Sequence, residues 1–94
     1  IHARTALSTS HTASASEYIL AVTSVPTSIQ FDATDFSEGQ VLVVKDESGN
    51  ASGASPVTLS PSGSQTIDGE SAVHIESPYG SVLIYSNGAN WFIY

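Results

Sequence analysis

Residues 77–94 read SPYGSVLIYSNGANWFIY, with a short apolar run on each side of Asn87-Gly88. Runs of this length are typical of β-strands, and Asn-Gly is a strong cue for a tight hairpin turn because glycine accepts a positive φ. The order of apolar run and turn recurs upstream, in VLVVKDESGNAS at residues 41–52 and in QTIDG at residues 65–69. No helical periodicity fits these segments, so the sequence predicts an all-β fold.

Turn residues place the predicted strands about ten residues apart, a spacing typical of small all-β domains. The segments with a strand pattern are residues 17–23, 28–32, 40–46, 57–59, 65–67, 72–77, 81–86 and 90–94. Residues 33–40 are predicted to form a loop that Phe36 anchors to the body of the domain. We therefore expect a small antiparallel β-sandwich or an interleaved β-module.

The first sixteen residues have a different composition from the rest. They are mostly Ala, Ser and Thr, and Leu7 is their only large apolar side chain after Ile1. Such a segment offers too little apolar surface to offset the entropy lost on ordering. We expect a stalk-like arm at residues 1–16, running as a linker or extended along partner chains, and a single β-domain at residues 17–94. The start without Met suggests a piece of a longer polypeptide.

Alternate residues of a strand point to opposite faces of its sheet. In residues 41–44 and in the final hairpin both sets of alternate positions are apolar, so neither face suits water. A chain of 94 residues buries little surface of its own, and without Cys it has no disulfide to compensate. We expect a homotrimer with a parallel three-fold axis that covers the second face. The core or subunit-interface candidates are Val41, Leu42, Val43, Val44, Leu83, Tyr85, Trp91, Phe92 and Tyr94.

The charge balance excludes two classes of partner. Arg4 and Lys45 are the only basic residues besides His, against nine carboxylates, for a formal net charge of −7. Nucleic acid and anionic membrane surfaces both require clustered Lys and Arg, so we expect neither as a partner. The apolar runs at residues 19–22 and 41–44 have four residues each, against about 20 for a membrane-spanning helix, so we expect no membrane insertion.

The residues that carry catalysis in hydrolases are poorly arranged here. There is no Gly-x-Ser-x-Gly elbow, and His2 and His11 lie in the low-complexity arm, whereas a triad needs a rigidly oriented base. Asp32 and Asp35, or residues 46–47, are more simply interpreted as turn residues than as a glycosidase pair, because so small a module has little room for a substrate groove. We expect no enzymatic activity and no cofactor.

Two patterns suggest metal ligands. Asp46, Ser48 and Asn50 resemble the start of a calcium loop, but the twelve-residue pattern with its terminal Glu is incomplete, so a turn is the better interpretation. For His2 and His11 two interpretations stay open: a solvated arm, or a metal site built from three chains on a three-fold axis. No metal site is predicted within one chain.

Turns that join strands can vary without disturbing the core, so residues 46–55 and 77–80 are the expected contact loops. Tyr79, between Pro78 and Gly80, is the aromatic residue least easily explained as core. Its ring, beside Asn and Asp side chains, would suit a sugar. The receptor-contact candidates are Asp46, Glu47, Ser48, Asn50 and Tyr79.

Five short motifs occur in a characteristic order: KDESGNA at 45–51, TIDG at 66–69, YGSV at 79–82, SNG at 86–88 and NW at 90–91. With their spacing over residues 18–94, they resemble a segment of bacteriophage tail-fibre and other virion surface proteins. The resemblance implies a non-enzymatic, homotrimeric module of a tail fibre, spike or needle tip in the virion, beside other virion proteins. It also implies host attachment through a surface receptor or glycan. Two alternatives remain: a capsid decoration or head-fibre protein, and a carbohydrate-binding module.

Overall fold

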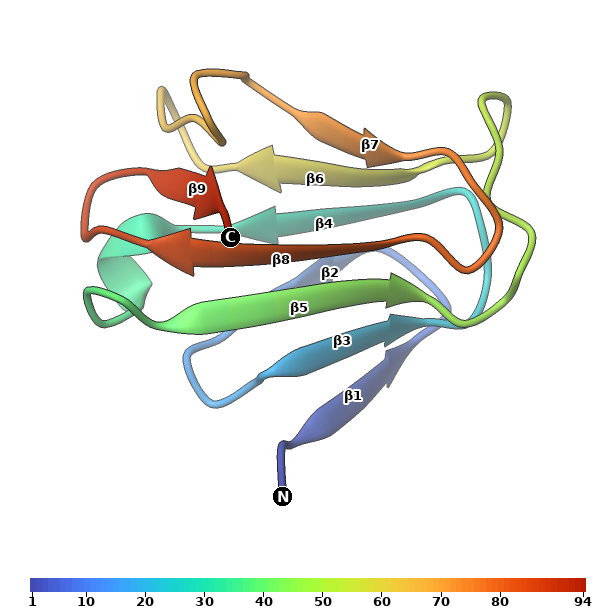
Figure 1. Ribbon diagram of the computed structural model, residues 1–94, viewed down its shortest axis with the longest axis horizontal. Coiled ribbons are helices and arrows are strands. Elements are labelled where there is room, and N and C mark those ends of the chain that lie inside the picture. Colours follow the sequence, from blue (N-terminus) through green and yellow to red (C-terminus); the bar gives the residue numbers. More distant parts are fainter.

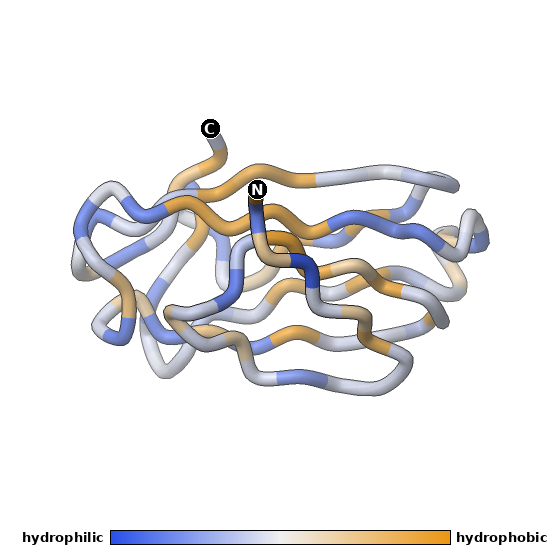
Figure 2. Tube along the Cα trace, turned by 90° about the horizontal axis from the view of Figure 1, so that it is seen from below, coloured by the Kyte–Doolittle hydropathy of each residue, from blue (hydrophilic) through white to orange (hydrophobic).

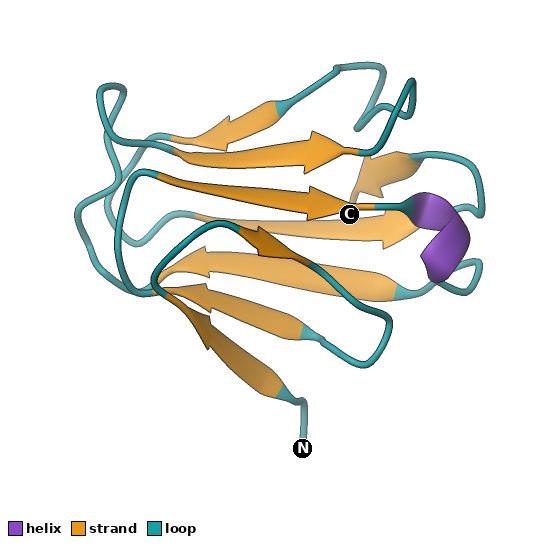
Figure 3. Cartoon of the chain, turned by 180° about the vertical axis from the view of Figure 1, so that it is seen from behind, coloured by secondary structure: helices purple, strands orange, loops and turns teal.

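The computed structural model describes residues 1–94 and contains nine β-strands, one short 3₁₀-helix and no α-helix. The strands form two mixed sheets, seen as a nearer and a farther layer in Figure 1 and from the other side in Figure 3. No helix in the structure has the length and apolarity needed to cross a membrane. The elements are β1 (Arg4–Leu7), β2 (His11–Thr12), β3 (Ile19–Val22), β4 (Thr27–Phe31), η1 (Ala33–Asp35), β5 (Val41–Asp46), β6 (Val57–Pro61), β7 (Val73–Ile75), β8 (Ser81–Ser86) and β9 (Trp91–Ile93).

The first six strands alternate between the two sheets. Sheet A has the order β1-β3-β5-β8-β9 and sheet B the order β2-β4-β6-β7. Consequently β1, β3 and β5 run parallel to one another, as do β2, β4 and β6. Two parallel neighbours in one sheet need a crossover connection between them, and here a strand of the other sheet provides it. The chain therefore winds back and forth between the two sheets as a two-layered coil.

Antiparallel pairing is confined to the last three strands, where β7 joins β6, β8 joins β5 and β9 joins β8. The expected all-β class is confirmed, whereas the expected antiparallel arrangement is wrong for the first six strands. Strand periodicity reports which side chains share a face, and it carries no information about which strand lies alongside or in which direction it runs.

Most predicted strands are present with ends shifted by one or two residues. The exception is residues 65–67, where only Ile67 takes part in isolated bridges, to Glu70 and to Trp91. The hairpin cue at Asn87-Gly88 is confirmed, since β8 and β9 pair antiparallel and Gly88 has φ of 93° in the turn between them. Asp68 and Gly69, with φ of 50° and 84°, form a tight turn that the single Ile67–Glu70 bridge closes. Positive φ at these positions gives the backbone the twist that tight hairpins require.

The expected stalk-like arm is instead the first turn of the coil. The Ile19 amide donates to the Ala3 carbonyl at 2.9 Å, and the Ala13 amide donates to the Gln30 carbonyl at 2.8 Å. Leu7 and Ala13 are buried. The small side chains of this segment cannot form a core alone, but β3 and β4 supply the apolar surface against which they pack. The structure therefore has no boundary at residue 16.

Buried side chains from both sheets meet in a single core, with Trp91 fully buried near one end. Its indole makes edge-to-face contacts with Phe31 and with Phe36, each at a centroid distance of 4.9 Å. The predicted anchoring of the 33–40 loop by Phe36 is confirmed. Figure 2 shows the two layers edge-on, with apolar stretches in the strands of both.

Candidate functional site

The turn after β5 is organised around a buried carboxylate. Asp46 is fully buried, and its Oδ1 accepts from the amide and the hydroxyl of Ser48, at 3.1 and 2.5 Å. Its Oδ2 accepts from the Ala51 amide at 3.0 Å and from the Tyr79 amide at 3.2 Å. Burial alone would raise the pKa of the Asp46 carboxyl, but the hydrogen bonds from Ser48, Ala51 and Tyr79 together outweigh it and hold the pKa below its ordinary value. One carboxylate thus ties the 46–51 turn to the 77–80 turn.

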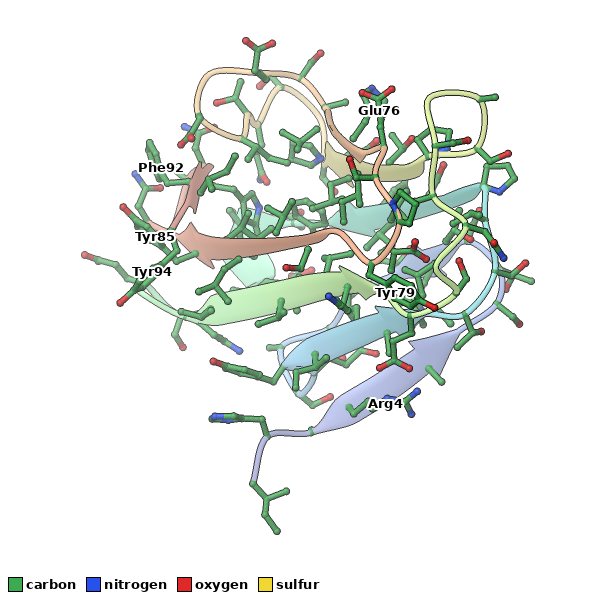
Figure 4. All side chains as sticks on the ribbon, turned by 45° about the vertical axis from the view of Figure 1, so that its right-hand side comes forward. Arg4, Glu76, Tyr79, Tyr85, Phe92 and Tyr94 are labelled. Atoms are coloured by element: carbon green, nitrogen blue, oxygen red, sulfur yellow. The ribbon has the colours of Figure 1, made fainter.

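Tyr79 projects from the second of these turns and is 61% exposed. Its φ is +60°, a conformation that a residue with a bulky side chain seldom adopts. Three contacts hold it there: its amide donates to Asp46, its carbonyl accepts from the Lys45 ammonium group, and its ring lies over Gly49. A Cβ at Gly49 would collide with the ring atoms. The chain therefore presents an exposed aromatic ring on a rigid support (Figure 4).

The predicted contact residues occupy different environments in this region. Asp46 was expected to contact a receptor, but it has no exposed surface, because the backbone amides that it binds enclose it. Ser48 is half-buried and donates to Asp46. Glu47 and Asn50 are exposed, as is Tyr79. The surface available to a partner is thus Tyr79 with Glu47 and Asn50, while Asp46 and Ser48 support it from below.

Glu47 forms an ion pair across the surface with Arg4 of β1. The Arg4 Nε donates to Glu47 Oε2 at 3.0 Å, and a second nitrogen donates to Oε1 at 2.5 Å. These hydrogen bonds, aided by the positive charge, lower the pKa of the Glu47 carboxyl from its ordinary value. The ion pair joins β1 to the 46–51 turn.

The core or interface candidates divide into two sets by strand alternation. Leu42, Val44 and Trp91 point inward and are fully buried. The others point outward from sheet A and are only partly buried, or exposed in the case of Tyr94. With Ile19 of β3, which was not among the candidates, they form a continuous surface that we call the outer apolar face: Ile19, Val41, Val43, Leu83, Tyr85 and Phe92, with Tyr94 at its margin.

Three aromatic side chains pack against one another at one end of the outer apolar face. The Tyr85 ring stacks on Phe92 at a centroid distance of 5.7 Å and meets Tyr94 edge-on at 6.2 Å. The Tyr94 amide donates to the Leu83 carbonyl at 2.7 Å, which fixes the chain end against β8. Figure 4 shows the three rings side by side, at the opposite end of sheet A from Tyr79.

The outward face of sheet B is entirely polar. Its cross-strand neighbours are Thr12, Ser28, Gln30, Thr58, Ser60 and His74. A shallow hollow of about 270 Å³ lies over β2 and β4, lined by Ser10, His11, Thr12, Ser28 and Gln30. Its lining contains no apolar side chain and no carboxylate, so it offers only hydroxyl, amide and imidazole groups.

The two histidines of the N-terminal segment, His2 and His11, have separate partners. The His2 ring stacks on Tyr18 at a centroid distance of 4.2 Å, and His11 Nε2 lies 2.8 Å from Glu17 Oε2. Burial would raise the pKa of Glu17, but hydrogen bonds from the Ser14 amide and from His11 lower it below the ordinary value. No group of three His, Cys, Asp or Glu residues is placed to hold a metal ion.

Comparisons of this chain with protein-family models, with curated proteins and with solved structures found no match.

The sequence indicated that Asp46 belongs to a turn, and Ser48 two positions later has the spacing of a partner within that turn. Sequence reasoning missed the burial of Asp46, its link to the 77–80 turn and the polarity difference between the sheets. A signal for the polarity difference lay in TSIQF at 27–31 and VTLSP at 57–61, where polar and apolar residues alternate, in contrast to VLVV at 41–44.

Proposed function

We propose that this chain is a non-enzymatic structural module of a phage tail fibre, spike or needle tip, located in the virion and serving host attachment. It acts as a homotrimer beside other virion proteins and touches a host-surface receptor or glycan through its turns. The order of motifs over residues 18–94 supports the virion assignment, and the surface around Tyr79 supports the attachment role.

The observation that carries the attachment role is the combination of exposure and rigidity at Tyr79. An exposed aromatic ring with few remaining torsional freedoms loses little entropy on binding, and it offers a large apolar surface to a partner. Here the backbone of Tyr79 is fixed on both sides by Asp46 and Lys45, and its ring rests on Gly49. The strained φ fits this role, because such conformations persist where the surrounding structure imposes them and are concentrated at functional positions.

A carbohydrate-binding module is the second candidate function, and the same residue favours it. Sugar rings pack on flat aromatic faces and exchange hydrogen bonds with neighbouring carboxylate and amide groups. Glu47 and Asn50 are exposed on the adjoining turn and would supply such groups. A capsid decoration or head-fibre protein would use the same fold without a receptor, so it is the alternative to which a negative binding result would point.

The experiment is a binding comparison on beads that carry many copies of the chain, so that valency is set by the bead and not by self-association. Wild type, Tyr79→Ala and Tyr94→Ala are applied to an array of bacterial surface glycans and to intact bacterial cells. Tyr94 is the matched control, since it is also exposed but lies at the opposite end of sheet A. Attachment through Tyr79 predicts binding that Tyr79→Ala abolishes and Tyr94→Ala retains.

Binding to isolated glycans independent of any virion context would favour the carbohydrate-binding module. Absence of binding to every cell and glycan tested, with wild-type beads, would contradict attachment and favour decoration. Release of shortened glycans from the array would overturn the non-enzymatic assignment.

A further inference from the structure

The outward faces of the two sheets differ in polarity, although in both sheets the side chains alternate between inward and outward positions. On sheet B the outward positions are hydroxyl, amide and imidazole side chains, as expected for a sheet with one face in water. On sheet A most of the equivalent positions carry aliphatic and aromatic side chains, and the exceptions are Arg4, Lys45 and Ser81. Sheet B therefore serves as an internal reference, and sheet A departs from it in the direction of a sheet that is covered on both sides.

The apolar positions are neighbours across strands and form one patch. Val43 of β5 lies between Ile19 of β3 and Leu83 of β8, while Val41 lies beside Tyr85, which in turn lies beside Phe92 of β9. Each of these side chains keeps part of its surface exposed. A continuous apolar patch whose members all keep some surface exposed is a candidate interaction surface.

We propose that the outer apolar face is the self-association surface of this protein and that its occupant is a second copy of the same chain. The inference rests on the proposed function, since it names the surface through which the proposed homotrimer assembles. In that assembly the nearer layer of Figure 1 faces the three-fold axis, and the polar face of sheet B and the Tyr79 turn remain in solvent.

The charge distribution favours an identical copy as the occupant. Each chain has a formal net charge of −7, so two copies repel least when they meet through a surface that lacks carboxylates. The outward positions of the sheet A strands contain no Asp or Glu. They contain Arg4 and Lys45, the two basic residues other than His in the chain. Copies that meet here keep most of their negative charge apart and bring Lys45 and the Arg4–Glu47 ion pair to the rim.

The side of the molecule that carries the outer apolar face is broad enough for a stable association. The molecule measures 32 × 30 × 20 Å, and sheet A lies on one of its broad sides (Figure 1). A stable protein interface requires about 800 Å² from each partner, which a side of these dimensions can provide. The aromatic cluster of Tyr85, Phe92 and Tyr94 would supply the kind of residue that contributes most of the binding energy at interfaces.

The test compares one added carboxylate on each outward face, using sedimentation equilibrium of the full chain over a range of concentrations. Leu83→Glu introduces a charge at the centre of the outer apolar face, and Ser60→Glu introduces the same charge on the polar face of sheet B. We expect wild type and Ser60→Glu to self-associate alike. We expect Leu83→Glu to raise the subunit dissociation constant about 100-fold or more, because association would bury an unpaired charge.

Circular dichroism and the fluorescence of Trp91, the only tryptophan, verify that each variant is folded. If Leu83→Glu does not fold, Leu83→Ser replaces it, and an unchanged dissociation constant for Leu83→Ser would overturn the inference. A wild-type chain that sediments as a monomer at every concentration, or equal dissociation of the Ser60→Glu and Leu83→Glu variants, would also overturn it.

A dimer disrupted only by Leu83→Glu would support self-association through the outer apolar face and contradict the homotrimer. Loss of self-association leaves the bead-bound Tyr79 test unaffected, so the two proposals fail separately.

Discussion

The backbone amide of Tyr79 donates a hydrogen bond of 3.2 Å to Oδ2 of Asp46, 33 positions earlier in the chain. Through this contact a fully buried carboxylate helps to fix the position of the exposed Tyr79 ring. Asp46 itself lies at the end of β5, the strand that β3 and β8 flank on either side. The position of Tyr79 is therefore coupled to the central strand of sheet A, and substitution of the buried Asp46 should alter the 77–80 turn.

Replacement of Asp46 by Asn tests this coupling. Asn keeps the size of the side chain but replaces one acceptor oxygen by an amide that donates, so two of the four donors around it lose their partner. We expect Asp46→Asn to lower the free energy of unfolding by about 2–3 kcal/mol, measured by urea denaturation. Glu38→Gln, an exposed carboxylate neutralised in the same way, is the control and should change it by under about 0.5 kcal/mol. Equal effects of the two substitutions would contradict the role of Asp46.

Acid should weaken the fold through the same group. The pKa of Asp46 in the folded protein lies below its ordinary value of 3.8, and that of Glu17 lies below 4.5. A carboxyl with a depressed folded pKa contributes stability that is fully present above the unfolded pKa and is lost as the pH falls through the folded pKa. We expect the free energy of unfolding to stay nearly constant from pH 7 to about 5.5 and then to fall through pH 4 and below. Urea midpoints across this range provide the measurement.

The Asp46→Asn variant supplies the matched comparison for the acid effect. Because Asn does not titrate, this variant should lose less stability than wild type between pH 6 and about 3. Parallel curves for the two proteins would show that Asp46 does not contribute to the acid sensitivity, and would leave the partly buried Glu17 as the next carboxyl to test.

Trp91 allows the packing contribution of its ring to be separated from that of its polar atom. The indole is fully buried against Phe31 and Phe36, and its Nε1 makes no hydrogen bond within the chain. Trp91→Ala should lower the free energy of unfolding by about 3–5 kcal/mol, because it leaves a large cavity. Trp91→Phe retains the edge-to-face contacts and breaks no hydrogen bond, so we expect a loss of only about 1–2 kcal/mol. Thermal and urea denaturation measure both, and equal losses would indicate that Nε1 has a partner.

The sequence predicted the features that depend on neighbouring residues. The strands from residue 19 onward follow from apolar alternation, and the turns at Asp68-Gly69 and Asn87-Gly88 follow from the conformations that these residues accept. The outward and inward sets of β8 and β9 were also predictable, because alternation fixes which side chains share a face. Tyr79 was identified as a surface residue from its place in a Pro-Tyr-Gly turn.

Features that depend on distant contacts were not predictable. Residues 4–12 form strands only because β3 and β4 lie beside them, and their own composition indicates a linker. The parallel coil carries no internal repeat: the sheet A strands begin at Arg4, Ile19 and Val41, at unequal intervals. The burial of Asp46 was also not predictable, because a carboxylate is buried only when several hydrogen-bond donors surround it. One of these donors, the Tyr79 amide, comes from the distant 77–80 turn.

Gly49 provides the sharpest test of how Tyr79 is held. Gly49 has φ of +72° and lies under the Tyr79 ring, whereas Gly39 has φ of +83° and no atom within 4 Å of where a Cβ would be. Gly39→Ala therefore measures the backbone strain alone, which should destabilise the fold by about 1 kcal/mol. Gly49→Ala adds a collision with the ring, and we expect an additional loss of about 1–2 kcal/mol.

If the collision is the cause, Gly49→Ala in a Tyr79→Ala background should destabilise no more than Gly39→Ala does. The double-mutant cycle, measured by urea denaturation, should then give a coupling energy of about 1–2 kcal/mol between Gly49 and Tyr79. Additive effects of the two substitutions would mean that the ring does not rest on Gly49 in solution, and Tyr79 would then lack the rigidity on which the attachment role depends.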